Sequence, residues 1–195
     1  SYSRILYHII IAPWRRQPVI NQDHERVLYK FIYDLANRQD VKIWRIGGMP
    51  DHVHILCELP TKLSASAFVQ HIKSESSKYL RYSRLFTNWN KWSRSFGCFS
   101  VDYETRNQRI EYIKNQKTHH AVKSFEDEFR EILKRYGFTD DTPLLGDESL
   151  MIDSLRFQTH FYSTSSRAGR RLRASAYAAT SKIIALQAIL YNLHY

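Results

Sequence analysis

The run Met49-Pro50-Asp51-His52-Val53-His54-Ile55-Leu56 decides the fold and holds the first candidate site. Residues 53–59 are mostly apolar and β-branched, which predicts a strand. Side chains alternate between the two faces of a strand, so His52 and His54 point to the same face. Two imidazoles one strand step apart can hold a single divalent ion, or they can be ordinary hydrogen-bonded histidines. Asp51 is either a turn residue or an acceptor that orients His52.

The segments around this strand predict an α+β domain. Strands are expected at residues 4–12, 41–46, 53–59 and 96–101, and helices at 21–37, 64–82, 105–120 and 125–136. The first six elements follow the order βαββαβ, which is typical of ferredoxin-like folds with an antiparallel sheet and two helices on one face. The second strand is expected to end at Gly47-Gly48 and to form a hairpin with the histidine strand. The first and third strands are central neighbours in this topology, so the histidines lie in the middle of the sheet, a rigid place for metal ligands.

Composition limits the class of protein. The 195 residues fit one domain, and 43% hydrophobic residues suffice for a core. The net charge of +10 favours a polyanionic partner. Cys57 and Cys98 lack the CxxC spacing of a zinc ribbon and suit a reducing compartment. We find no apolar run of the roughly 20 residues that cross a bilayer, and no signal-peptide pattern at the N-terminus. A cytoplasmic protein without a membrane partner is expected.

The character of the sequence changes after Gly137. Residues 1–138 are predicted to form one domain, and residues 139–195 an extension of unclear role. The extension contains an Arg-rich segment at 163–173 and an amphipathic helical pattern at 183–193. It is compatible with a nucleic-acid arm, a partner helix, or sequence foreign to the domain.

The predicted helix 105–120 carries a second candidate group. Tyr112 and Gln116 are four residues apart and therefore share one helical face. A tyrosine hydroxyl can attack phosphorus and keep the cut strand as a covalent ester, although its ordinary pKa of about 10 requires help from a metal or a base. Gln116 offers a neutral oxygen that can complete a metal site, and oxygen ligands with open positions point to Mg²⁺ or Mn²⁺. In the alternative interpretation, Tyr112 packs against the helix and Gln116 is solvated.

Several separated motifs resemble the HUH single-tyrosine transposases of small bacterial insertion sequences. They are Tyr7-His8-Ile9-Ile10, Met49 to His54, Gly97-Cys98-Phe99-Ser100-Val101, Tyr112 to Gln116, and the run from His119-His120 to Phe129. The resemblance covers roughly residues 2–138 and does not extend to the last 50 or so. It implies that residues 1–138 form a catalytic domain with His52, His54 and Gln116 as ligands of Mg²⁺ or Mn²⁺ and Tyr112 as the nucleophile.

The resemblance also implies an activity and its partners. The enzyme would cleave and rejoin single-stranded DNA that carries hairpins at the element's ends, through a 5′-phosphotyrosine. It would act as a homodimer in which the tyrosine helix of one subunit often serves the histidines of the other. The sequence has no P-loop and no GxGxxG, in agreement with a transfer between phosphodiesters that needs no nucleotide cofactor.

Candidate DNA contacts are basic or aromatic. They are Arg15, Arg16, Lys73, Lys78 and Arg81 for phosphates, and Trp14, Trp89 and Trp92 for stacking on bases. For each of them, a solvated charge or a core aromatic is the alternative interpretation.

Three other functions use similar sequence features. A non-catalytic ferredoxin-like module that binds single-stranded RNA or DNA is the main one, and it predicts no metal requirement. A domesticated relative that processes chromosomal hairpin repeats would use the same residues as a transposase. A replication or conjugation nickase is disfavoured by motif order, because in those enzymes the tyrosine usually precedes the histidines.

Overall fold

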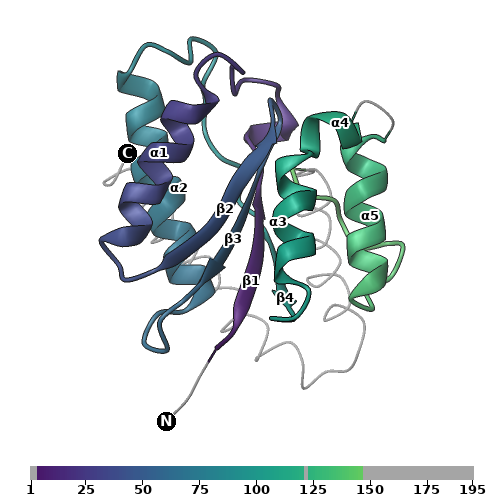
Figure 1. Cartoon of the computed structure of the whole chain (residues 1–195). Helices are drawn as coiled ribbons and strands as arrows, with labels where there is room; N and C mark the ends of the chain where they lie inside the picture. Colours follow the sequence, from purple (N-terminus) through teal and green to yellow (C-terminus); the bar gives the residue numbers. More distant parts are fainter. Residues whose placement is uncertain (1–3, 121–122, 147–195) are drawn as a thin grey trace, which may run out of the picture. The chain divides into compact units, whose positions relative to one another are not determined.

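The computed structural model describes residues 4–120 and 123–146, which form a four-stranded antiparallel sheet with helices around it (Figure 1). The strands are β1 (Leu6–Ile11), β2 (Lys42–Met49), β3 (His52–Glu58) and β4 (Gly97–Val101). The helices are η1 (Trp14–Arg16), α1 (Glu25–Asn37), α2 (Ala65–Tyr82), α3 (Arg106–Lys114), α4 (Gln116–His120) and α5 (Phe125–Arg135). The element order and the strand order β2-β3-β1-β4 confirm the ferredoxin-like α+β fold.

The division of the chain at residue 138 stays a prediction. The amphipathic pattern at 183–193 and the Arg-rich segment lie outside the described residues. Within the part that is described, no helix is long and apolar enough to span a bilayer.

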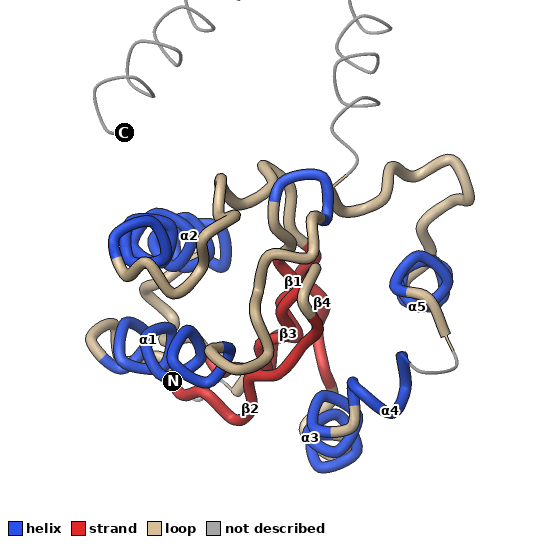
Figure 2. The backbone as a smooth tube through the Cα atoms, turned by 90° about the horizontal axis from the view of Figure 1, so that it is seen from above, coloured by secondary structure: helices blue, strands red, loops and turns tan. Residues whose placement is uncertain are grey.

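Alternation along the two central strands separates the two faces of the sheet. Ile9 of β1 and Ile55 of β3 are fully buried in the main core, together with Leu28 of α1 and Phe68 and Ile72 of α2. Figure 2 shows α1 and α2 together on this face, as predicted, and α3, α4 and α5 on the other. The helix pair arises from apolar residues recurring every three to four positions.

The opposite face carries the histidines and is covered by the later helices. Ile113 of α3 packs against Leu56 of β3, and Phe129 of α5 packs against Phe99 of β4. His52 and His54 share the face of Leu56 because the strand alternates. The histidine pair is therefore enclosed between the sheet and α3, α4 and α5 rather than open to solvent.

The second strand does not end at Gly47-Gly48 as predicted. β2 continues to Met49, with Gly47 opposite His54 in the register. A Cβ atom on Gly47 would lie 2.7 Å from the backbone oxygen of Ile113. The glycine therefore lets the backbone of α3 lie directly against the sheet. The expected hairpin between β2 and β3 is confirmed.

The single helix expected over residues 105–120 is divided in two. α3 ends at Lys114, Asn115 leaves helical geometry at φ −96° and ψ 18°, and α4 begins at Gln116. Asparagine is a poor helix former because its side chain competes for backbone hydrogen bonds, so a break here is physically reasonable. The break allows Gln116 to be buried.

Candidate active site

The two histidines of β3 are buried, and each has one ring nitrogen without a hydrogen-bond partner. Asp51 Oδ1 accepts a hydrogen bond from His52 Nδ1 at 2.9 Å, so Asp51 orients His52 as well as lying in the turn. His54 Nδ1 lies 2.8 Å from His8 Nε2. Both Nε2 atoms remain buried without a hydrogen-bond partner. Metal-binding histidines are held in this way, with one nitrogen fixed by a neighbour and the other available to the ion.

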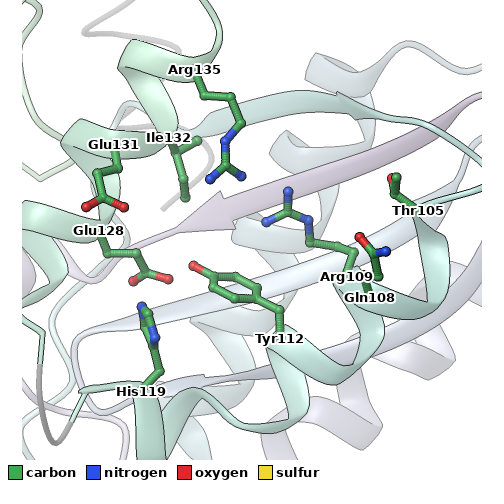
Figure 3. Close-up of a pocket in the computed structure, with 9 residues that line it drawn as sticks. All are labelled: Thr105, Gln108, Arg109, Tyr112, His119, Glu128, Glu131, Ile132 and Arg135. Carbon is green, nitrogen blue, oxygen red and sulfur yellow. The ribbon is translucent and has the colours of Figure 1, made fainter.

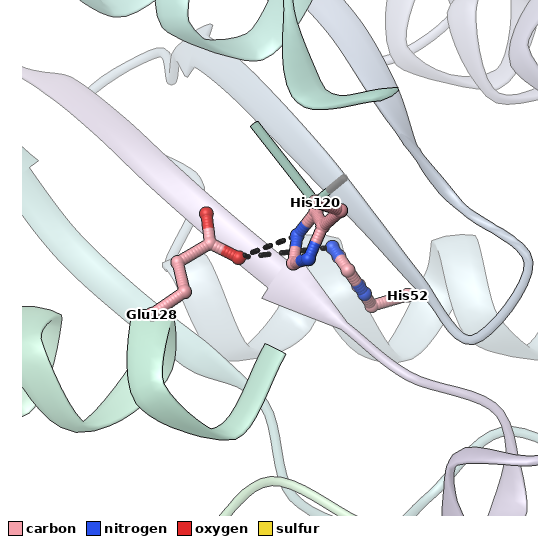
Figure 4. A group of neighbouring side chains, drawn as sticks. All are labelled: His52, His120 and Glu128. Carbon is pink, nitrogen blue, oxygen red and sulfur yellow. Dashed lines mark ion pairs between the residues drawn. The ribbon is translucent and has the colours of Figure 1, made fainter. Parts of the chain in front are cut away.

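Gln116 and two residues from further along the chain meet these histidines. Gln116 Nε2 donates to Glu128 Oε1 at 2.9 Å. The Glu128 carboxylate oxygens lie 3.8 Å from His54 Nε2 and 4.0 Å from His52 Nε2. His120 Nε2 lies 2.8 Å from Glu128 Oε2 (Figure 4), yet neither atom has a hydrogen bond of regular geometry. Strand β3, α4 and α5 thus contribute to one cluster.

The cluster contains five buried polar atoms that lack hydrogen-bond partners. They are His52 Nε2, His54 Nε2, His120 Nε2, Gln116 Oε1 and Glu128 Oε2. Each such atom costs on the order of 1–3 kcal/mol, so their accumulation points to a ligand. Ligand atoms of His52, His120 and Glu128 lie within 4.8 Å of one another. Imidazole nitrogens with carboxylate and amide oxygens suit a divalent ion, and the residues present therefore fit one.

Burial controls the protonation of this cluster. It lowers the pKa of His54 well below the ordinary imidazole value, and with the His52 charge it lowers the pKa of His120 to about 4. These imidazoles are neutral near pH 7, which is the form that binds metals. Burial, together with the Asp51 carboxylate, raises the pKa of Glu128 to about 8. Without a cation Glu128 is largely protonated at neutral pH, and a bound cation favours its carboxylate form.

Tyr112 of α3 lines a cavity of about 350 Å³ beside the cluster. Its ring stands edge-on to the rings of His54 and His8, with centroid distances of 6.0 and 6.2 Å. His119 lies on its other side at 5.5 Å. Figure 3 shows the Tyr112 hydroxyl pointing into the cavity toward Glu128. The candidate nucleophile and the candidate metal ligands therefore lie together within one chain.

Positive charge faces the same cavity. Arg109 of α3 and Arg135 of α5 both line it, and in Figure 3 their guanidinium groups point into the space beside the Tyr112 hydroxyl. The Arg109 guanidinium lies over the Tyr112 ring, 5.0 Å from its centroid. Burial lowers the pKa of Arg109, and the charge of Arg135 acts in the same direction, whereas Tyr136 and Glu128 act against it.

Three of the predicted DNA contacts lie on the other side of the sheet. Lys73, Lys78 and Arg81 belong to α2, which covers the face opposite to α3 (Figure 2). Lys73 Nζ donates to the backbone carbonyls of residues 93–95 at 2.7 to 3.3 Å, which joins α2 to the following loop. The role of these residues in DNA binding stays a prediction.

Trp14, Arg15 and Arg16, three more of the predicted DNA contacts, form η1. The Arg16 guanidinium lies 5.5 Å from the centroid of the Phe125 ring, and that ring lies 4.2 Å from the ring of His52. This short helix therefore approaches the histidine cluster. Its contact with DNA also stays a prediction.

The last two predicted DNA contacts, Trp89 and Trp92, pack on the side of the sheet that α2 covers. Trp92 is buried in the main core and Trp89 packs against it. Their Nε1 groups donate to Ser76 and Ser77 of α2, Trp92 to Ser76 at 2.9 Å and Trp89 to Ser77 at 3.2 Å. Their stacking on bases stays a prediction.

Sequence reasoning missed several residues that the fold brings to this site. They are His8, His120, Glu128, Arg109 and Arg135. Glu128 left a signal, because it occupies a position in the apolar stripe of α5 where a charged residue is rarely buried without a task. Arg109 left another, since it lies three residues before Tyr112 on the same helical face. The approach of His120 and Arg135 depends on how α4 and α5 pack, which no local pattern encodes.

Known proteins to which this chain is similar are described as transposases. The sequence profile of the family described as "Transposase IS200 like" matches residues 1–116. The transposase for insertion sequence element IS200 of Salmonella typhimurium is 30% identical over 115 residues, covering 56% of this chain and 75% of the relative. The ISDra2 transposase TnpA of Deinococcus radiodurans is 28% identical over 115 residues, covering 56% and 82%. The solved structure of a REP-associated tyrosine transposase bound to a REP hairpin superposes with a TM-score of 0.48 at 16% identity, covering 76% of this chain and 91% of that one.

Proposed function

The chain belongs to the IS200-like transposase family, and from this premise we propose that it cleaves and rejoins single-stranded DNA at hairpin-bearing ends through a 5′-phosphotyrosine on Tyr112. Family membership confirms the resemblance to HUH single-tyrosine transposases, and the protein is a transposase. One observation carries the finer proposal. In a single chain, Tyr112 lines the same cavity as Glu128, which belongs to a buried cluster of partnerless metal-ligand atoms.

The proposed reaction exchanges one phosphodiester for another. Tyr112 Oη forms a bond to phosphorus, the bond from phosphorus to the 3′ oxygen breaks, and the 5′ end stays on the tyrosine. The phenol loses its proton and the departing 3′ oxygen gains one. A second 3′-hydroxyl then attacks the phosphotyrosine and releases the phenol. The two ester bonds are of similar energy, so no nucleotide cofactor is needed.

A divalent ion, Mg²⁺ or Mn²⁺, is part of the proposal. His52, His54 and Gln116 would hold it through the ring nitrogens and the amide oxygen that lack partners in the protein. When bound, such an ion supplies positive charge that polarises the phosphate and stabilises the attacking phenolate. The role of Asp51 is to hold the His52 ring so that Nε2 faces the cluster.

The proposed partners are single-stranded DNA with hairpins and a second copy of the chain. The position of Arg16, stacked on Phe125 beside His52, supports a DNA path past η1. Lys78 and Arg81 are proposed to contact phosphates farther from the cleavage point. The short distances between Tyr112 and the histidines support chemistry within each subunit of the proposed homodimer.

The test is covalent capture of DNA by the full chain. Labelled single strands from both flanks of the gene are incubated with the protein, with and without Mn²⁺, and separated on a denaturing gel. We expect a covalent adduct that needs Mn²⁺ and that Tyr112→Phe abolishes while hairpin binding persists. The matched control is Tyr103→Phe, because Tyr103 is exposed, its ring contacts the guanidinium groups of Arg4 and Arg106, and it does not line the cavity. Adducts that persist in Tyr112→Phe, or a protein that binds single strands and never forms adducts, would favour another nucleophile or a non-catalytic binding module.

A further inference from the structure

The cavity beside Tyr112 presents two positive charges to the same space. Arg109 reaches it from α3 and Arg135 from α5, and Figure 3 shows both guanidinium groups directed toward the region next to the phenol oxygen. The cavity volume of about 350 Å³ leaves room for a phosphate with parts of its two sugars. The two helices that deliver the arginines pack on the histidine face of the sheet.

The acidic residues of the cavity act on these arginines only from a distance, since their direct contacts are with other side chains. Glu131 pairs with Lys123, and Glu128 accepts from Gln116. Among the described residues, neither Arg109 nor Arg135 has an ion pair or a hydrogen bond to a carboxylate. Two guanidinium groups that face each other across a partly buried space repel, and binding an anion between them relieves the repulsion.

The donor geometry of these arginines suits a phosphate. A guanidinium presents parallel N–H donors that match two oxygens of a phosphate. Arg109 lies one helical turn before Tyr112 and covers its ring at 5.0 Å, so an anion held by Arg109 lies next to the phenol.

We propose that Arg109 and Arg135 hold the non-bridging oxygens of the phosphate that Tyr112 attacks, and that they stabilise the negative charge that builds up on this phosphate during transfer. Both are then catalytic residues, because they touch the reacting phosphate. This inference rests on the proposed function of Tyr112. It adds a phosphate-binding site, formed by Arg109 and Arg135, that is separate from the metal ligands. Fixed donors aimed at developing charge are among the strongest catalytic devices.

The first experiment measures the affinity of this site for phosphate without any DNA cleavage. Inorganic phosphate is titrated into the full-length protein by calorimetry, for the wild type and for Arg109→Gln and Arg135→Gln. We expect each variant to bind phosphate at least about tenfold more weakly. Arg106→Gln on α3 and Arg130→Gln on α5 are the matched controls, since Arg106 stacks on Trp44 and Tyr103 and Arg130 pairs with Glu126. Equal phosphate affinity in all five proteins would overturn the assignment.

The second experiment tests the catalytic role on DNA. Once the wild type has revealed the cleaved phosphate, that position is replaced by a neutral methylphosphonate. On ordinary DNA, Arg109→Gln and Arg135→Gln should slow adduct formation on the order of 100-fold with little change in DNA affinity. On the methylphosphonate the variants should approach the wild-type rate, because the charge they stabilise is gone. An equal loss on both substrates would mean that the arginines are structural.

The two levels of inference fail separately. If Tyr112→Phe still forms adducts, the proposed nucleophile is wrong whatever the arginines do. If Tyr112→Phe abolishes adducts while Arg109→Gln and Arg135→Gln form them at the wild-type rate, the nucleophile is supported and the proposed phosphate-binding site is wrong.

Discussion

Replacing Glu128 with glutamine should separate the metal-binding and structural parts of the candidate site. Glu128 is 2% exposed and lies within 4.0 Å of ring nitrogens from His52, His54 and His120. Glutamine has the same shape and can still accept the hydrogen bond from Gln116. The change therefore removes the charge with little disturbance of packing.

The distances in the cluster allow one ion to touch this carboxylate and its neighbours. Ligands about 2.1 Å from an ion lie about 3.0 Å apart at right angles and about 4.2 Å apart when opposite. The separations of 2.8, 3.8 and 4.0 Å between Glu128 and the three histidines are close to this range. Loss of the charge should weaken Mn²⁺ binding by at least about 10–100-fold. This corresponds to roughly 1.4–2.7 kcal/mol, or roughly 3–10 °C less thermal stabilisation by the metal.

Calorimetric titration with Mn²⁺ and thermal unfolding with and without Mn²⁺ measure this effect directly. Glu126→Gln is the matched control, because Glu126 lies on the exposed side of the same helix and pairs with Arg130. Wild-type Mn²⁺ affinity in Glu128→Gln, with an undiminished shift in unfolding temperature, would refute the reasoning that places the ion against this carboxylate.

Four further predictions follow from the same geometry. In EDTA, the raised pKa of Glu128 means that its protonated form supports the fold. This contribution to the free energy of unfolding is at most about 5 kcal/mol, is complete below about pH 4.5 and is lost as the pH rises through about 8. Urea unfolding measured across this pH range should show the decrease for the wild type and not for Glu128→Gln. Mn²⁺ should bind more tightly than Mg²⁺ because imidazole nitrogens suit Mn²⁺ better, and calorimetry showing the reverse order would contradict the ligand set. Gly47→Ala should cost about 1–3 kcal/mol and slow adduct formation, because its Cβ would meet the Ile113 carbonyl at 2.7 Å; unchanged unfolding and adduct rates would argue against a tight contact. Mixing Tyr112→Phe with His54→Ala should not restore adducts if each subunit uses its own tyrosine, whereas recovery on a gel would indicate exchange of the tyrosine helix between subunits.

Local pattern was enough for the sheet and for the face of the histidine pair. Alternation in β3 places His52 and His54 together whatever surrounds them, and the order of strands and helices restricts the topology. The helical spacing of Tyr112 and Gln116 predicted that they lie near each other, but not how Gln116 is buried. Asn115 breaks the helix between them, so Gln116 is buried at the start of α4 and is not carried on the outside of a continuous helix.

The contribution of α5 could not be predicted because it is set by tertiary packing. Phe125, Phe129 and Ile132 bury the apolar stripe of α5, and this docking brings Glu128 to the histidines. A sequence pattern shows that the stripe is apolar, but it does not show which surface the stripe will cover. The charge of Glu128 within that stripe was the available clue.

Tyr112 lies between two groups of side chains that the fold supplies independently, one suited to hold a cation and one that carries positive charge itself. On one side are the metal-ligand atoms grouped around Glu128, and on the other are Arg109 and Arg135. An ordinary tyrosine keeps its proton near pH 7, so attack on phosphorus requires the phenolate to be stabilised while a dianionic transition state forms. A metal alone can neutralise only the oxygens it touches, and the arginines can hold the remaining phosphate oxygens. The position of the phenol at the boundary between these groups is why we propose Tyr112, among the 13 tyrosines in this chain, as the nucleophile.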